Sequence, residues 1–193
     1  KNSKIGNFCS IILSIRPKYI LKFPAGPVFD QSIDYFDELT QFVNKLNPEI
    51  KPKVKLRVKE TSVYNFEKEF SKRFSEKNID KVSSKNPFEK TILNSKLIIV
   101  TYPQTAFSQA MYSNTPTILI IKKNYFRFTE NALRTFNDLK KNKIAFEDFN
   151  EAKKHINDNW KELDLWWKSK NVQFARERFL KNFFNVKSNW YKE

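Results

Sequence analysis

The chain has 193 residues, of which 16% are aromatic, and its 36 Lys and Arg outnumber 21 Asp and Glu to give a net charge of +15. The chain has one cysteine, Cys9, which excludes an internal disulfide, and one histidine, His155, which excludes a multi-histidine metal site. It has two glycines, too few for the glycine-rich loops of P-loop and dinucleotide-binding proteins. The basic balance is expected to attract nucleic acid, anionic lipid or anionic small ligands.

The first third of the chain is predicted to hold two strands with a helix between them. Residues 8–15 form a short apolar run typical of a buried parallel strand, which ends at Arg16. From 30 to 46 apolar residues recur every three or four positions, which predicts an amphipathic helix with Asp30 as its N-cap. Residues 54–58 alternate apolar and basic side chains, the pattern of a half-buried strand.

The middle of the chain gives the clearest strand–helix–strand pattern. Residues 97–101 and 117–121 are predicted to be central strands, and 104–112 a helix between them. Shorter elements are predicted before this unit, namely a surface helix or loop, a strand and a helix, at 61–76, 79–82 and 87–94.

The last third is predicted to be mainly helical. Helices are expected at 128–141, 148–159 and 162–184, with a short edge strand at 144–146. Strands that alternate with helices predict an α/β fold, a Rossmann-like parallel sheet flanked by helices. The C-terminal helices are expected to pack across this sheet. No linker rich in Gly or Ser divides the chain, so residues 1–193 are interpreted as a single domain.

The loop after the first central strand is the candidate anion site. Ligands of open parallel sheets bind outside the carboxyl ends of the strands, often at a helix N-terminus. Thr101 and Thr105 can add hydroxyl groups there, and Gln109 follows Thr105 by one helical turn, within reach of a ribose. From spacing alone, the simpler reading is preferred: Thr101 caps the helix, and Thr105 and Gln109 are solvated.

Basic residues near the ends of the first two strands form a second candidate group. Arg16 follows the first strand, and Arg57 and Lys59 lie on or just after the second. All three are expected near one edge of the sheet, where they could neutralise a phosphate or a sugar carboxylate. A solvated face is the simpler reading for any one of them.

The tryptophans gather toward the C-terminus among lysines. Packing of the last helix is the preferred explanation, and base stacking or an interfacial helix on anionic lipid are the alternatives. No signature of a nucleic-acid-binding module is present, so nucleic acid is not an expected partner. His155 is expected on an exposed helix face with no role. The tryptophans are Trp160, Trp166, Trp167 and Trp190.

The stretch from Asn94 to Ile118, NSKLIIVTYPQTAFSQAMYSNTPTI, resembles a recurring block of GT-B glycosyltransferases. In that block an apolar strand leads to a Ser/Thr-bearing loop, a helix with an acidic residue and a Pro-Thr-Ile strand. The chain is most similar to a family of transferases encoded in bacterial surface-carbohydrate gene clusters. It is more distantly similar to capsule polysaccharide and CDP-glycerol glycerophosphotransferases. Segments 152–157 and 166–173 share the resemblance, which covers about residues 30–190.

The resemblance implies that the chain is the C-terminal, donor-binding half of a longer two-domain GT-B enzyme. It assigns Thr101, Tyr102, Gln104 and Thr105 to the phosphate loop. Gln109 stands where many relatives have a ribose-binding Glu; an amide still forms hydrogen bonds, but the change casts doubt on full activity. The catalytic base generally comes from the N-terminal half, so this chain is expected to lack it, and no catalytic residue is assigned.

The function expected is therefore transfer of a sugar or sugar-phosphate unit from an activated nucleotide to a surface-polysaccharide acceptor. Expected partners are the nucleotide-activated sugar, the N-terminal half and an anionic membrane surface. No metal or cofactor is expected. The expected location is cytoplasmic, peripheral on the inner membrane face. The alternative is a basic module that binds nucleic acid or docks on anionic membranes.

Overall fold

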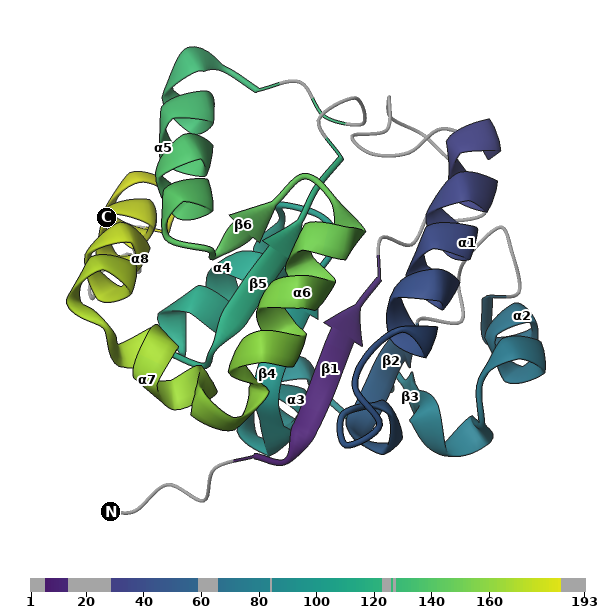
Figure 1. Ribbon diagram of the computed structural model, residues 1–193. Coiled ribbons are helices and arrows are strands. Elements are labelled where there is room, and N and C mark those ends of the chain that lie inside the picture. Colours follow the sequence, from purple (N-terminus) through teal and green to yellow (C-terminus); the bar gives the residue numbers. More distant parts are fainter. Residues whose placement is uncertain are drawn as a thin grey trace.

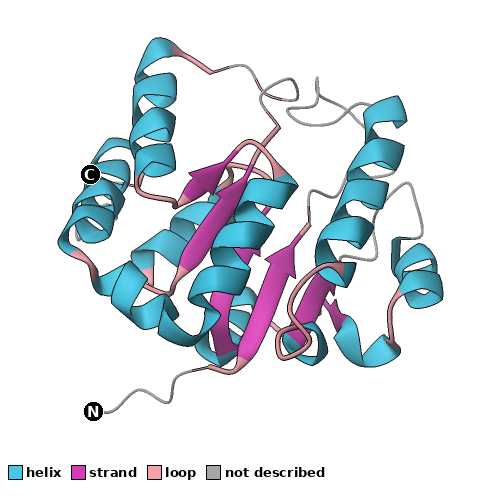
Figure 2. Ribbon diagram, in the orientation of Figure 1, coloured by secondary structure: helices cyan, strands magenta, loops and turns pink. Residues whose placement is uncertain are grey.

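The computed structural model describes residues 6–13, 29–58, 66–83, 85–122, 126 and 128–184. Its centre is a parallel six-stranded sheet in the order β3-β2-β1-β4-β5-β6 (Figures 1 and 2). The order reverses at β1, because the chain builds outward on one side to β3 and then returns to β4 on the other. The strands are β1 Phe8–Ile12, β2 Val54–Val58, β3 Ile79–Lys81, β4 Ser95–Val100, β5 Thr117–Ile120 and β6 Ala145–Phe146.

Helices cover both faces of the sheet, and each face has its own apolar core (Figure 1). The first face carries α1 Phe29–Asn44, α2 Phe66–Arg73 and α6 Phe149–Asn159. The second carries α3 Phe88–Asn94, α4 Thr105–Tyr112, α5 Glu130–Lys141 and α8 Lys170–Phe183. Single 3₁₀ turns occur at Lys51–Lys53, Glu76–Asn78 and Trp160–Glu162. The expected Rossmann-like fold is confirmed.

Alternation along the strands explains why two cores form. Successive side chains of a strand point to opposite faces. Ile11 of β1 and Ile99 of β4 therefore join the first core, while Ile12 and Ile98 join the second. All four are buried, which is the burial expected for the central strands of a parallel sheet.

The predicted terminal helix 162–184 is wrong as a single element. The chain forms α7 Leu163–Lys168 and then α8, and the two are separated at Ser169, whose ψ of 144° is extended. The Nε1–H of Trp167 donates to the backbone carbonyl and side-chain oxygen of Asn114, at 3.0 and 2.9 Å. The break allows α7 to fill the end of the second core while α8 packs against α4 and α5.

The segment expected as a surface helix or loop contains the surface helix α2, in which Lys72 and Arg73 are exposed and Phe70 is buried in the first core. Two smaller expectations need correction. Helix α1 begins at Phe29, so Asp30 lies inside its first turn and is not the N-cap. His155 is half-buried, with its ring against Phe146 and Trp166.

The tryptophans are packing residues wherever the structure describes them. Trp160 and Trp167 are each 2% exposed, and Trp166 packs between the two cores. Trp190 lies outside the described residues. The buried indoles of Trp160 and Trp167 are therefore unavailable for stacking on bases or for insertion into lipid. Among the described helices, none combines the length and the apolar character that crossing a bilayer requires.

Candidate functional site

The candidate site lies where the strand order reverses, at the carboxyl ends of β1 and β4. The chain leaves β1 for α1 on one face and leaves β4 for α4 on the other. Diverging connections of this kind open a crevice between two parallel strands, the usual ligand position in open α/β sheets. Residues 14–28, which follow β1, are not described, so the described wall of the crevice is the loop after β4.

Thr101 joins the elements on either side of this crevice. Its N–H donates to the carbonyl of Ile12 at 3.2 Å, and its hydroxyl donates to the same carbonyl at 3.1 Å. Because the hydroxyl proton of Thr101 is already donated to Ile12, the hydroxyl of Tyr35 in α1 is the donor in its hydrogen bond with Thr101 Oγ1, at 2.7 Å. Thr101 is 4% exposed. Its hydroxyl therefore stabilises the loop and does not cap α4.

The rest of the loop turns tightly without glycine. The N–H of Gln104 donates to the carbonyl of Tyr102 at 3.0 Å, across Pro103. Tyr102 is half-buried, and burial raises the pKa of its phenol, an effect that the positive charge of Arg57 partly opposes. The turn leaves Gln104 in extended backbone, at φ −124° and ψ −160°, directly before α4.

The N-terminus of α4 is exposed at this edge. Gln104 is the N-cap residue, and its side chain forms no capping hydrogen bond. Its carbonyl accepts from the N–H of Phe107 and Ser108, at 2.9 and 3.3 Å. Gln104 and Thr105 are both exposed. A helix end of this kind presents backbone N–H groups and a partial positive charge, which favour an anion.

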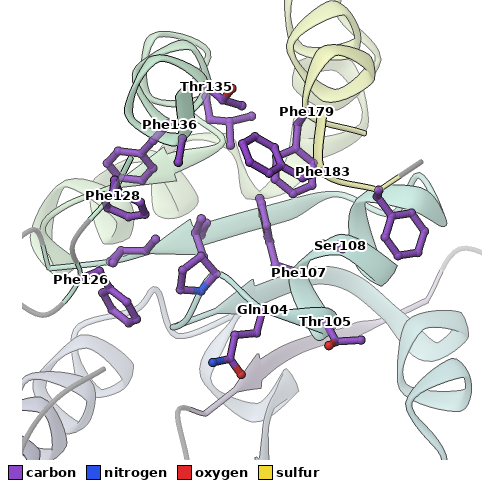
Figure 3. A pocket seen from close by; sticks show the side chains of 16 residues that line it. Gln104, Thr105, Phe107, Ser108, Phe126, Phe128, Thr135, Phe136, Phe179 and Phe183 are labelled. Atoms are coloured by element: carbon purple, nitrogen blue, oxygen red, sulfur yellow. The ribbon is translucent and has the colours of Figure 1, made fainter. Parts of the chain in front are cut away.

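A cavity of about 530 Å³ begins at this helix end and extends between α4, β5, α5 and α8. In Figure 3 the ring of Phe107 points toward Phe179, and the ring of Phe136 lies beside Phe128. Gln104 and Thr105 lie at one edge of the group. The lining is mainly aromatic and aliphatic, and it includes Phe126, Phe128, Phe183, Phe184, Leu119, Ile121 and Leu139. This cavity was not predicted from the sequence.

The other predicted site residues are dispersed. Gln109 is half-buried on α4, one turn beyond Thr105, and is not among the cavity-lining residues. Arg57 is 5% exposed; its guanidinium donates to Asp80 at 3.1 Å and to Thr91 at 2.7 Å. Arg16 and Lys59 lie outside the described residues. The structure therefore brings together Gln104 and Thr105, and it gives Arg57 internal partners.

Two further polar groups lie near the crevice, and neither was predicted from the sequence. One is Tyr35, described above. The other is an ion pair between Lys122, which follows β5, and Glu38 of α1. The second carboxylate oxygen of Glu38 is buried with no hydrogen-bond partner among the described residues. The pair links the residue that follows Ile121, at the end of β5, to α1 on the first face of the sheet.

The one cysteine of the chain lies within the described residues. Cys9 is fully buried in β1, and burial raises the pKa of its thiol to about 12, so it stays protonated and unreactive at neutral pH. No group of three or more His, Cys, Asp or Glu side chains in the described ranges is placed to hold a metal ion.

Comparison with known proteins assigns the family. A family model described as LIC12162 family transferase matches residues 2–193. Neither a curated protein nor a solved structure gave a match to the chain. The match covers nearly the whole chain and confirms the expectation of a transferase family.

Proposed function

The chain belongs to the LIC12162 family of transferases, and from this premise we propose that it binds an activated nucleotide donor. The donor supplies a sugar or sugar-phosphate unit to a surface-polysaccharide acceptor. Its diphosphate lies at the N-terminus of α4, next to Gln104 and Thr105. The observation that carries the proposal is that this helix end is exposed, has no side-chain cap and lies at the carboxyl edge of the sheet.

Each group at the α4 N-terminus has a definite part in this proposal. The backbone N–H groups of the first turn and the Thr105 hydroxyl donate to the diphosphate oxygens, and the Gln104 amide adds one further donor. These donors stabilise the negative charge that develops on the leaving group, which is the nucleoside diphosphate when a sugar is transferred and the nucleoside monophosphate when a sugar-phosphate is transferred. This arrangement needs no glycine-rich cradle and no metal ion. Gln109, one turn further along α4, is the proposed contact to the ribose.

The architecture proposed is the C-terminal half of a two-domain GT-B enzyme. The strand order supports it, because a nucleotide bound at the β1–β4 reversal faces outward from the sheet edge, toward a second domain. The N-terminal half then supplies the catalytic base that takes the proton from the acceptor hydroxyl. The proposed location is the cytoplasmic face of the membrane, where the net charge of +15 favours an anionic surface.

Calorimetry with UDP, GDP, CDP, CMP and inorganic diphosphate tests the proposal. We expect at least one nucleotide to bind, and Thr105→Ala to weaken that binding by up to about tenfold through loss of one hydrogen bond. Thr115→Ala is the matched control, since Thr115 lies beyond the opposite end of α4. Equal weakening by both variants, or no binding of any nucleotide even with the N-terminal half attached, would overturn the proposal.

A further inference from the structure

The cavity beside α4 has an uneven distribution of polar groups. Its interior is walled by phenylalanine rings from α4, α5 and α8 and by aliphatic side chains of β5 (Figure 3). Polar side chains of the lining gather on the first turn of α4, at Gln104, Thr105 and Ser108. One other lining hydroxyl, that of Thr135, already accepts from the Nδ2–H of Asn182, at 3.4 Å. The cavity therefore has an apolar interior and a polar rim.

This distribution selects between classes of ligand. A sugar or a nucleobase placed among the phenylalanine rings would leave several of its own donors and acceptors without partners, and each would weaken binding. A hydrocarbon chain has no such groups, and the aromatic walls gain by being covered. The volume of about 530 Å³ lies within the range usual for small-molecule sites, roughly 300–1,000 Å³.

The rim adds a requirement for the other end of the ligand. The N-terminus of α4 presents a partial positive charge at the cavity mouth, and the chain as a whole carries a net charge of +15. An anionic head group is therefore complementary to the rim, just as an apolar chain is to the interior. Both requirements are met in one molecule by a phosphate ester of a long-chain alcohol.

We propose that the cavity holds the hydrocarbon chain of an alkyl or isoprenyl phosphate ester, with the head group of that ester at the rim beside Ser108, next to the donor diphosphate at Gln104 and Thr105. The inference rests on the proposed function only in naming this ester as a substrate of the transferase. Recognition of the chain itself depends on the phenylalanine-lined interior. The protein thus recognises the hydrocarbon chain by apolar contacts inside the cavity and the head group by its charge at the rim.

A homologous series of butyl, hexyl, octyl and decyl phosphates, each below its micelle concentration, tests the proposal by calorimetry on the full chain. Affinity is expected to rise with each added methylene by up to about fourfold until the cavity is filled. Octanol is expected to bind more weakly than octyl phosphate, because it lacks the charged head. An affinity that does not change with chain length, or no binding of any member, overturns the proposal.

A cavity-filling variant tests where the chain binds. Ala132 lines the cavity on α5 and is small, so Ala132→Trp is expected to fill the space and to remove the dependence on chain length. Leu133→Trp is the matched control, since Leu133 is the next residue after Ala132, is 40% exposed and is not among the lining residues. Thermal melts verify that both variants fold. Chain-length dependence that survives in Ala132→Trp places the chain elsewhere and overturns the proposal.

The two proposals fail separately. Nucleotide binding without chain-length dependence leaves the donor site standing and refutes the hydrocarbon site. Chain-length dependence without nucleotide binding supports the hydrocarbon site and refutes the donor site. Ala132→Trp also separates them, because it is expected to leave the affinity for inorganic diphosphate at the α4 N-terminus within about twofold of wild type.

Discussion

Two polar regions lie on the same face of the sheet, and they are built in opposite ways. Beneath α3, the guanidinium of Arg57 donates to Asp80, to the Thr91 hydroxyl and, at 2.8 Å, to the carbonyl of Asn86. At α4, the helix end has no side-chain cap and is exposed beside an apolar cavity. One region supplies partners for its charge from within the protein, and the other leaves its partial charge to solvent or ligand.

The difference shows how a basic residue near a sheet edge should be interpreted. A buried charge is tolerated only when it is paired and hydrogen-bonded, and Arg57 meets both conditions with its internal partners. Such a residue holds β2, β3 and α3 together. The N-terminus of α4 has no side-chain cap and, among the described residues, no charged partner, so an anion is expected to bind most favourably there. Here, a charged group whose hydrogen bonds are all made within the protein is structural, and a charged group without such partners is a candidate for ligand binding. Position in the sequence did not distinguish the two.

Removing Arg57 is expected to have the largest effect of any change considered. Arg57→Ala removes the guanidinium that donates to the Thr91 hydroxyl and pairs with Asp80, which keeps only its neutral donors in a largely buried site, so the free energy of unfolding should fall by about 3 kcal/mol. Urea denaturation followed by circular dichroism measures it. A loss below about 1 kcal/mol would show that the network is not structural.

A second substitution of Arg57 distinguishes a structural role from a ligand-binding role. Arg57→Lys keeps the positive charge but loses the planar, multiply bonded geometry, so it should destabilise the fold and leave nucleotide affinity nearly unchanged. If it instead weakened nucleotide binding without changing stability, Arg57 would belong to the ligand site. Calorimetry on the folded variant distinguishes these outcomes.

Gln104→Asp should move stability and binding in opposite directions. Aspartate is a preferred N-cap residue and its charge complements the helix dipole, so the free energy of unfolding should rise by about 1 kcal/mol. The same carboxylate should repel a phosphate and weaken nucleotide binding by about tenfold or more. Misfolding cannot mimic this combination.

The charge in that variant has its own control. Gln104→Asn also provides a preferred N-cap but no charge, so it should raise stability and weaken nucleotide binding far less than aspartate does. Equal weakening by the two variants would mean that competition for the backbone N–H groups, and not repulsion, is the cause. Tighter binding in Gln104→Asp would place the anion elsewhere.

The fold was largely predictable from the sequence because strand and helix periodicities are local. Strand Val54–Val58 was predicted to the residue. The break at Ser169 was not, because no Gly or Pro marks it and it depends on how Trp167 reaches Asn114 across the fold. Gly6 carried no visible signal either, yet a Cβ there would lie 2.3 Å from the backbone carbon of Asn94.

The candidate site was predictable only in part. The position of Thr105 at a helix start follows from local pattern, and the structure places it there. The internal use of Thr101 and Arg57 was not predictable, because it depends on partners 66 and 23 positions away, namely Tyr35 and Asp80. The cavity could not be predicted from the sequence for the same reason, since its walls come from helices that are distant in sequence.

His155 gives the smallest and most specific test of the same distinction. Its Nδ1 accepts from the Nδ2–H of Asn159 at 3.2 Å, and its Nε2 is buried with no partner among the described residues. Burial and the nearby charge of Lys143 lower the pKa of the imidazole to about 4, against a partial opposing effect of Asp158. The ring is therefore a neutral packing group between Phe146 and Trp166, and its charge has no role.

A depressed histidine pKa has a definite signature in stability. The unfolded chain binds a proton at His155 near pH 6.5 and the folded chain only near pH 4, so the stability that neutral His155 contributes is complete above pH 6.5 and is lost as the pH falls toward 4. After allowance for solvent screening, wild type should lose about 1 kcal/mol more than His155→Gln between pH 7 and pH 4. Denaturant melts at a series of pH values measure the difference. A difference of the opposite sign would mean that His155 is charged in the folded protein, and that an internal partner for that charge exists after all.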